Sequence, residues 1–175
     1  MTTPPALGLD GFNRIGERQR MHLLFGVCAS PIWARRVLAG APFADVDALL
    51  ERADRILAEL PDAEIDAALD GHPRIGDRVD NDASAREQAG VASAGDDVRA
   101  ALAAGNRAYE ERFGYVYLVC ASGRSADELL AILIERLGND PETERRVMRD
   151  ELAKINRLRL QRLLSAPADE AGSNA

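Results

Sequence analysis

Helix-start signals are the feature of this sequence that most constrains its fold. Ser30-Pro31 places a capping serine before a proline suited to the first helical position, and Ser125-Ala-Asp-Glu128 is a capping box. Asp45 and Asp140-Pro141-Glu142 give two further starts, the second with acid in the first turn. Repeated starts of this kind, separated by glycine and proline, predict a series of helices.

Apolar residues at helical spacing extend these starts into helices. After Asp45, for example, Val46, Leu49, Leu50 and Ala53 recur on one face. The predicted helices span residues 16–28, 31–38, 46–60, 61–71, about 97–112, 126–137 and about 141–164, with Gly71 as a left-handed cap at the end of the fourth. Residues 72–82 are predicted to form a loop, because Gly, Pro, Asp and Asn cluster there.

The fold predicted from this pattern is all-α, a single compact domain of about seven to nine helices over residues 1–175. The run Tyr115–Cys120 has the composition of a strand but no credible partner, so we expect a buried extended or helical segment. The ordered core is expected to cover about residues 7–164. The small, polar tail from Ala166 onward is predicted to be disordered.

Charge and composition exclude several classes of protein. The 29 acidic and 22 basic residues give a net charge of −7, whereas nucleic-acid binding relies on a positive surface. No stretch approaches the roughly 20 apolar residues that span a bilayer. The first residues, Met-Thr-Thr-Pro-Pro, do not form a signal peptide, and the last, Ser-Asn-Ala, differ from a peroxisomal address. A cytoplasmic protein that binds neither nucleic acid nor membrane is therefore expected.

Cysteine and histidine show no disulfide or metal pattern. Cys28 and Cys120 lie far apart, each within an apolar run, which favours buried free thiols. The two histidines, His22 and His72, lie outside CxxC and HExxH contexts. No metal site is predicted.

The segment Gly71-His72-Pro73-Arg74-Ile75-Gly76 resists a purely structural explanation. Proline restricts the residue before it to extended backbone, so His72 is expected at a fixed place just beyond a helix end. Histidine changes protonation near neutral pH, as an acid–base catalyst must. Taken alone, the segment is explained better by a histidine that packs or caps helix carbonyls.

Three other segments combine polar groups in ways that suit a binding site. Ser84-Ala-Arg-Glu87-Gln88 reads locally as a capping box that would start a helix, with one of its two last side chains left to face a pocket. Val119–Gly123 leads into the helix capped at Ser125, where main-chain amides suit an anion or a carbonyl, although simple turn chemistry explains the segment better on local grounds. Near the end of the chain, Arg157 and Arg159 project on different faces, so at most one is expected to share a site.

The order of five motifs makes the combination specific. They are His72-Pro-Arg-Ile-Gly76, Ser84-Ala-Arg-Glu-Gln88, Phe113-Gly-Tyr-Val-Tyr-Leu-Val-Cys-Ala-Ser-Gly123, Arg136-Leu-Gly-Asn-Asp-Pro-Glu142 and Lys154-Ile-Asn-Arg-Leu-Arg-Leu160. The pattern resembles the OHCU decarboxylase family, whose substrate is 2-oxo-4-hydroxy-4-carboxy-5-ureidoimidazoline. Phe12-Asn13, Ser30-Pro31 and Trp33 also look like the N-terminal part of the family, so the resemblance covers about residues 7–162.

The resemblance implies an all-α, homodimeric enzyme of urate breakdown that forms (S)-allantoin without metal or organic cofactor, in the same pathway as urate oxidase and hydroxyisourate hydrolase. His72 matches the catalytic histidine of the family, and Glu87 is expected to assist it, acting either on the substrate or on the imidazole. The residues that match substrate-binding positions are Pro73, Ser84, Gln88, Val119, Cys120, Ala121, Ser122, Gly123 and Arg159. The substrate oxygen that Arg159 contacts is left open, and Arg157 would replace it if the last helix were rotated.

One departure and three alternatives accompany the resemblance. The stretch between His72 and Ser84 is shorter than in many animal members, and Arg74 stands where those carry an acid, so no role is transferred to Arg74. The alternatives are an enzyme acting on another ureide or hydroxy-imidazoline acid, a non-catalytic helical interaction module, and a metal-binding helical protein. The joint presence of the motif residues argues against the second, and the two distant histidines argue against the third.

Overall fold

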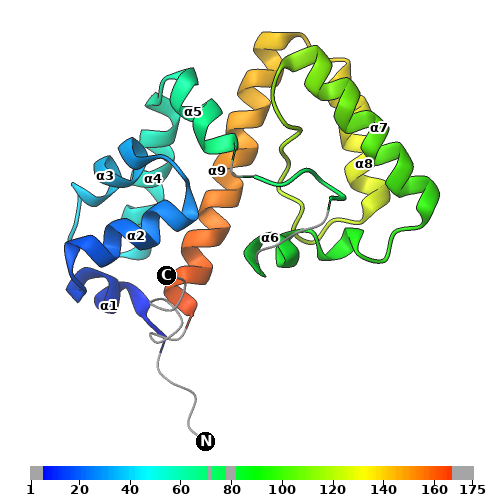
Figure 1. Ribbon diagram of the computed structural model, residues 1–175. Helices are drawn as coiled ribbons and strands as arrows, with labels where there is room; N and C mark the ends of the chain where they lie inside the picture. The colour runs from blue at the N-terminus through cyan, green and yellow to red at the C-terminus, as the bar shows by residue number, and fades with distance from the viewer. Residues whose placement is uncertain (1–5, 71, 78–81, 167–175) are drawn as a thin grey trace, which may run out of the picture. The chain divides into compact units, whose positions relative to one another are not determined.

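The computed structural model describes residues 6–70, 72–77 and 82–166, the side chains of residues 82 and 83 excepted. Within these ranges the regular structure is helical, with nine α-helices, one 3-10 helix and no β-strand (Figure 1). The elements are α1 (Gly8–Arg14), α2 (Glu17–Val27), α3 (Pro31–Leu38), α4 (Val46–Glu59), α5 (Asp62–Leu69), α6 (Asp82–Glu87), η1 (Ala89–Val91), α7 (Asp96–Phe113), α8 (Ala126–Leu137) and α9 (Pro141–Ser165). The all-α prediction is confirmed.

Side-chain caps explain why the predicted starts are accurate. The Ser30 hydroxyl oxygen accepts a hydrogen bond from the Trp33 N–H at 3.2 Å, and the Asp45 carboxylate accepts one from the Ala48 N–H at 2.7 Å. The Ser125 hydroxyl oxygen caps α8 by accepting from the Glu128 N–H at 3.2 Å. The second half of that capping box differs from expectation, because the Glu128 carboxylate accepts from the Ser125 hydroxyl, at 3.3 Å.

Some local expectations are corrected or confirmed by the structure, and others lie outside the described residues. α1 was not predicted, since the residue before it, Leu7, makes no side-chain cap. The helix at the Ser-x-x-Glu motif begins at Asp82, so Ser84 lies inside α6 and does not cap it. Tyr115–Cys120 is neither helix nor strand and is buried or half-buried, which agrees with the expected buried segment without a strand partner. The expected cap at Gly71 and the tail residues 167–175 are not among the described residues.

The described residues form two compact units. Unit 1 contains residues 6–68 and 155–166, and unit 2 contains residues 69–154. The prediction of one domain over residues 1–175 stays a prediction. No helix in the described part of the chain is both long enough and apolar enough to cross a membrane.

In unit 1, α2, α3 and α4 pack around a buried tryptophan. Trp33 is fully buried, and its indole N–H donates a hydrogen bond to the main-chain oxygen of Ala53 at 3.1 Å. The C-terminal part of α9 is joined to α4 by an ion pair at 2.6 Å between Arg157 and Asp54. These contacts fix the last turns of α9 within unit 1.

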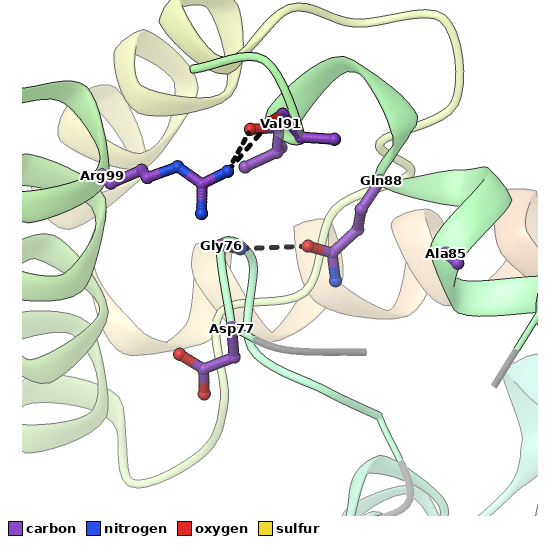
Figure 2. A pocket seen from close by; sticks show the side chains of 7 residues that line it. Gly76, Asp77, Ala85, Gln88, Val91 and Arg99 are labelled. Carbon is purple, nitrogen blue, oxygen red and sulfur yellow. Dashed lines mark hydrogen bonds between the residues drawn. The ribbon is translucent and has the colours of Figure 1, made fainter. Parts of the chain in front are cut away.

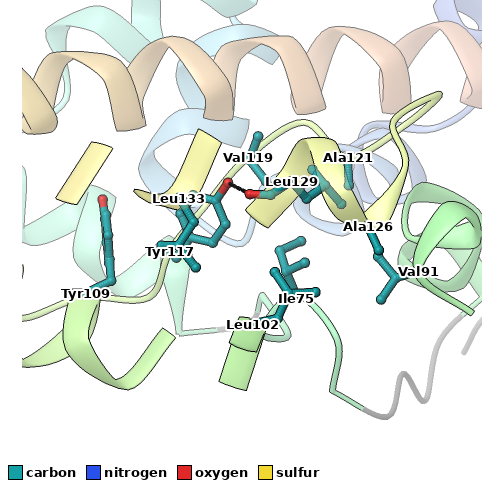
Figure 3. Packing of buried hydrophobic residues seen from close by; sticks show 10 residues of the cluster. All are labelled: Ile75, Val91, Leu102, Tyr109, Tyr117, Val119, Ala121, Ala126, Leu129 and Leu133. Atoms are coloured by element: carbon teal, nitrogen blue, oxygen red, sulfur yellow. Dashed lines mark hydrogen bonds between the residues drawn. The ribbon is translucent and has the colours of Figure 1, made fainter. Parts of the chain in front are cut away.

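Unit 2 is built on the packing of α7 against α8, which lie side by side in Figure 1. Its core cluster consists of Ile75, Val91, Leu102, Tyr109, Tyr117, Val119, Ala121, Ala126, Leu129 and Leu133 (Figure 3). The Tyr117 hydroxyl donates a hydrogen bond to the Leu129 main-chain oxygen at 2.9 Å. The segment after α7 is therefore held against α8 by burial and by this bond.

A buried ion pair completes unit 2. Arg136 and Glu144 are both buried, with a hydrogen bond of 2.7 Å from the Arg136 Nε to a Glu144 carboxylate oxygen. The Tyr109 hydroxyl and the Asn139 amide also donate to this carboxylate, at 2.5 and 2.9 Å. A second guanidinium nitrogen of Arg136 donates to the Leu118 main-chain oxygen at 2.7 Å. Charged groups buried in this way need such saturation of their hydrogen bonds.

Candidate active site

His72 follows directly on a helix end, as predicted. α5 ends at Leu69, and the His72 main-chain N–H donates to the Leu69 oxygen at 2.9 Å. The side chain is half-buried, with its Nε2 atom shielded from solvent, and Pro73 is half-buried beside it. The fixed main chain and the shielded ring nitrogen suit a histidine that transfers a proton at a defined position.

The turn after His72-Pro73 is held by the side chain of Gln88. The Gly76 N–H donates to the Gln88 side-chain oxygen at 3.0 Å, and the Gln88 amide nitrogen donates to the Arg74 oxygen at 3.3 Å (Figure 2). The Asn106 amide donates to the Ile75 oxygen at 2.9 Å from α7. Gly76 has a φ of +91°, a left-handed conformation that favours glycine.

Two further predicted residues lie in α6 and are buried. Ser84 is 2% exposed and Glu87 is 9% exposed. The pKa of the Cys120 thiol is raised, mainly by burial and further by the negative charges of Glu151 and Glu87. The negative charge of Glu87 therefore disfavours ionisation of the Cys120 thiol.

A close main-chain approach joins the α6 region to the 119–123 segment. A Cβ atom at Gly90, in η1, would overlap the main-chain oxygen of Arg124. The segment itself turns just before α8, with the Arg124 N–H donating to the Ala121 oxygen at 3.1 Å and Gly123 at a φ of +77°. Val119 and Ala121 are buried, Cys120 and Ser122 are half-buried, and Gly123 is exposed.

Unit 2 thus contains all but one of the predicted site residues. The His72-Pro73 turn is bonded to Gln88, and the residues that follow Gln88 pack against the end of the 119–123 segment. The remaining predicted residue, Arg159, belongs to unit 1. Its role, like those of the others, stays a prediction.

Arg159 and Arg157 have different surroundings within unit 1. A guanidinium nitrogen of Arg159 donates to the Val27 main-chain oxygen, at the end of α2, at 3.2 Å. Arg157 is engaged by the Asp54 carboxylate through two nitrogens, each at 2.6 Å. Arg157 is thus neutralised by an ion pair within unit 1, whereas Arg159 donates to a main-chain oxygen.

Both cysteines are free thiols, as predicted. Cys28 is fully buried beside Asn156 and Arg159, and burial raises its pKa to about 11. Cys120 is half-buried, and its pKa is also raised. The raised pKa of each thiol disfavours its thiolate form.

A pocket of about 240 Å³ opens beside the turn that Gln88 holds (Figure 2). It is lined by Gly76, Asp77, Ala85, Gln88, Val91, Ala92 and Arg99. The Arg99 guanidinium donates to the Val91 and Ala92 main-chain oxygens, at 3.3 and 2.9 Å, and so closes the end of η1. Among the described residues, no three His, Cys, Asp or Glu side chains gather as a metal site would require.

The contacts of two residues of this region were not predicted from the sequence, although Arg136 belongs to one of the five motifs. Glu151, in α9, accepts a hydrogen bond from the Cys120 N–H at 2.8 Å, and Arg136 holds the Leu118 oxygen. Each residue lies in a helix that is distant in sequence from the main-chain group it contacts. No side-chain pattern therefore marks either contact in the sequence.

Similar proteins carry consistent names. The chain is 44% identical over 63 residues to 2-oxo-4-hydroxy-4-carboxy-5-ureidoimidazoline decarboxylase of Amia calva, covering 36% of each chain. It is 29% identical over 140 residues to the Haloferax volcanii protein of the same name, covering 78% of this chain and 83% of that one. A crystal structure of OHCU decarboxylase in the presence of (S)-allantoin is 26% identical, with a TM-score of 0.73 over 81% of this chain and 96% of that chain.

The extent of the match differs among relatives. The chain spans about a third to a half of the length of the first three curated relatives, which include an Arabidopsis thaliana protein named uric acid degradation bifunctional protein TTL. The sequence model of OHCU decarboxylase, by contrast, matches residues 13–161, which is most of this chain. The chain belongs to the OHCU decarboxylase family.

Proposed function

We propose that this protein decarboxylates 2-oxo-4-hydroxy-4-carboxy-5-ureidoimidazoline to (S)-allantoin during urate breakdown. Membership of the family supports the reaction type. The similar crystal structure, obtained in the presence of (S)-allantoin, supports the product. The geometric observation that carries the proposal is the anchoring of the His72-Pro73 turn on Gln88, directly after Glu87.

The chemistry needs no separate electron sink. The bond between the ring carbon and the carboxylate breaks so that its electron pair moves into the adjacent ring imine, and carbon dioxide leaves. The ring nitrogen that receives the electrons takes up a proton, which leaves an enol. The hydroxyl of this enol becomes a carbonyl as its proton leaves, and one proton adds to one face of the former imine carbon, which bears the ureido group. Because the imine accepts the electrons, neither a metal nor an organic cofactor is required.

The residues of unit 2 suit the remaining tasks. His72 delivers the proton, since its main chain is fixed and its Nε2 atom is shielded. Glu87 polarises a substrate hydroxyl or the imidazole from its buried position in α6. Ser84, Gln88, Pro73 and the 119–123 main chain bind the ureido and ring groups, as oriented donors and acceptors.

Arg159 positions the substrate without gripping the departing carboxylate. A cation that bound the carboxylate strongly would stabilise the ground state and slow the loss of carbon dioxide. The bond from Arg159 to the Val27 oxygen supports a fixed guanidinium of this kind.

The test generates the labile substrate in place from urate, with urate oxidase and hydroxyisourate hydrolase, and follows the circular dichroism of allantoin. Fast formation of (S)-allantoin, lost in a folded His72→Asn variant, is the expected result. If the signal survives the substitution, the decarboxylase assignment stands but His72 is not the residue that transfers the proton. Racemic product at the uncatalysed rate would refute the decarboxylase assignment and turn the search to another ureide.

We further propose that the enzyme is a cytoplasmic homodimer that works in sequence with urate oxidase and hydroxyisourate hydrolase. Relatives named uric acid degradation bifunctional protein support a link to the other steps of urate breakdown. Sedimentation equilibrium is expected to give twice the mass of the 18.9 kDa chain. A monomer at micromolar concentration would contradict the dimer.

A further inference from the structure

The carboxylate of Glu151 is placed against the main chain of the predicted substrate-binding segment. One carboxylate oxygen accepts the Cys120 N–H at 2.8 Å, and the other accepts from the Lys154 ammonium at 2.7 Å. Glu151 is 8% exposed, so both oxygens need partners within the protein. A main-chain N–H bonded to a carboxylate forms a charge-assisted hydrogen bond, stronger than one to a neutral acceptor.

The same stretch of main chain is held from a second helix. The Leu118 oxygen accepts from the Arg136 guanidinium at 2.7 Å, two residues before the amide that Glu151 accepts. Buried charged side chains of α8 and α9 therefore fix a carbonyl and an amide on either side of Val119. Helical hydrogen bonds do not stabilise this stretch, which is neither helix nor strand, so its conformation depends on such contacts.

The bond also decides which amides are available to a ligand. The Cys120 N–H is taken up by Glu151, whereas the turn that follows, from Ala121 to Gly123, leads towards the N-terminus of α8. The Glu151 charge contributes to the raised pKa of the Cys120 thiol, as does that of Glu87. The two acidic residues, from α9 and α6, therefore act on the same residue of the segment.

We propose that Glu151 is a positioning residue of the active site. It anchors the main chain at Cys120 and so sets the direction of the main-chain groups at Ala121–Gly123 that bind the substrate. It does not contact the substrate, and the Cys120 amide is not a substrate donor. The inference rests on the proposed function, because the segment has this role only if the decarboxylation takes place there.

The test compares Glu151→Gln, which keeps an acceptor oxygen, with Glu151→Ala, which removes it. Asp150→Ala is the matched control, since Asp150 is an exposed acidic residue next to Glu151 on α9. Hydrogen exchange of the Cys120 amide, followed by NMR, reports the anchor without reference to any activity. Steady-state kinetics and the enantiomeric excess of allantoin report the site.

Glu151→Ala is expected to speed hydrogen exchange of the Cys120 amide at least tenfold and to lower the enantiomeric excess of allantoin. It is also expected to raise KM about tenfold, which corresponds to a loss of about 1.4 kcal/mol in substrate binding. Glu151→Gln should restore most of each value, and Asp150→Ala should match the wild type. Unchanged exchange in Glu151→Ala would refute the anchor. Faster exchange with unchanged KM and enantiomeric excess would refute the positioning role.

Failure of the proposed function gives a different pattern. If the wild-type protein shows slow exchange of the Cys120 amide but no turnover, the decarboxylase assignment and the positioning role are both refuted. The hydrogen bond between Glu151 and the Cys120 amide would still be supported by the slow exchange. If Glu151→Ala does not fold, Glu151→Gln decides. A Gln variant with fast Cys120 exchange and a wild-type KM would overturn the proposal.

Discussion

Gln88 and Gly76 are joined by a hydrogen bond of 3.0 Å in which the glycine N–H donates to the glutamine side-chain oxygen. The other end of the same amide donates to the Arg74 oxygen, so one side chain satisfies both edges of a turn. A side chain that the family pattern assigns to the substrate thus also shapes the loop that carries His72. Preorganisation of a catalytic loop in this way contributes to rate because the geometry is set before the substrate arrives.

Replacing Gln88 should therefore impair catalysis through the loop. Gln88→Met, which has similar length but no hydrogen bonds, is expected to lower kcat at least tenfold, since His72 loses its fixed position. Arg74→Met removes the solvent-accessible ion pairs with Glu110 and Asp77 and should change kcat less than twofold. Stopped-flow circular dichroism measures both variants. Equal effects of the two substitutions would contradict the role of Gln88.

Substitutions of the two arginines in the C-terminal part of α9, Arg157 and Arg159, are expected to have different effects. Arg159→Met is expected to raise KM about tenfold, because a guanidinium donor to the substrate is lost. Arg157→Met breaks the half-exposed ion pair with Asp54 and should cost less than about 1 kcal/mol of stability, with KM unchanged. Kinetics and urea unfolding on both variants measure the difference. A larger increase in KM for Arg157→Met than for Arg159→Met would mean that Arg157 binds the substrate instead of Arg159.

The close approach at Gly90 should not tolerate a side chain. Gly90→Ala is expected to destabilise the fold by about 1–3 kcal/mol, because the overlapping atom at Arg124 belongs to the main chain and cannot rotate away. Gly26→Ala is the control, since Gly26 is an exposed residue inside α2 with open space around it. That substitution should stabilise by about 0.5–1 kcal/mol. Midpoints of urea unfolding compare the two, and a neutral Gly90→Ala would refute the close contact.

The buried ion pair of unit 2 should be far more costly to break than an exposed one. Arg136→Met leaves the Glu144 carboxylate buried without its cation and is expected to cost about 3–5 kcal/mol. Arg36→Met breaks an exposed pair with Glu59 and should cost less than about 1 kcal/mol. Chemical unfolding gives both values. Similar losses would mean that the Arg136–Glu144 pair is solvated.

Stability should fall with rising pH above about 9. Burial raises the pKa of Cys28 from 9.0 to about 11, so the unfolded thiol loses its proton before the folded one does. The contribution is fully present below pH 9 and is lost between pH 9 and 11, a change on the order of 2 kcal/mol. Cys28→Ala should flatten the slope of unfolding free energy between pH 9 and 10. Burial also raises the pKa values of Tyr109 and Tyr117, so the unfolding free energy of the Cys28→Ala variant should still fall with pH once unfolded tyrosines begin to ionise.

Local signals in the sequence were enough to predict most of the helices. Where a side chain caps its own helix, as Ser30, Asp45 and Ser125 do, the start is encoded within three residues and the prediction was accurate. Ser84 shows the limit, because the same Ser-x-x-Glu spacing lies inside a helix that begins earlier. The identity of the site residues came from motif order and stays a prediction. Contacts from side chains to distant main chain, such as those of Gln88, had no local signal.

The raised thiol pKa values have a consequence for chemical durability. Peroxides and other oxidants attack the thiolate, so a cysteine that stays protonated reacts slowly. Burial holds Cys28 protonated, and at Cys120 burial is reinforced by two neighbouring carboxylates. Both cysteine thiols are therefore expected to be oxidised to sulfenic acid more slowly than an ordinary surface cysteine.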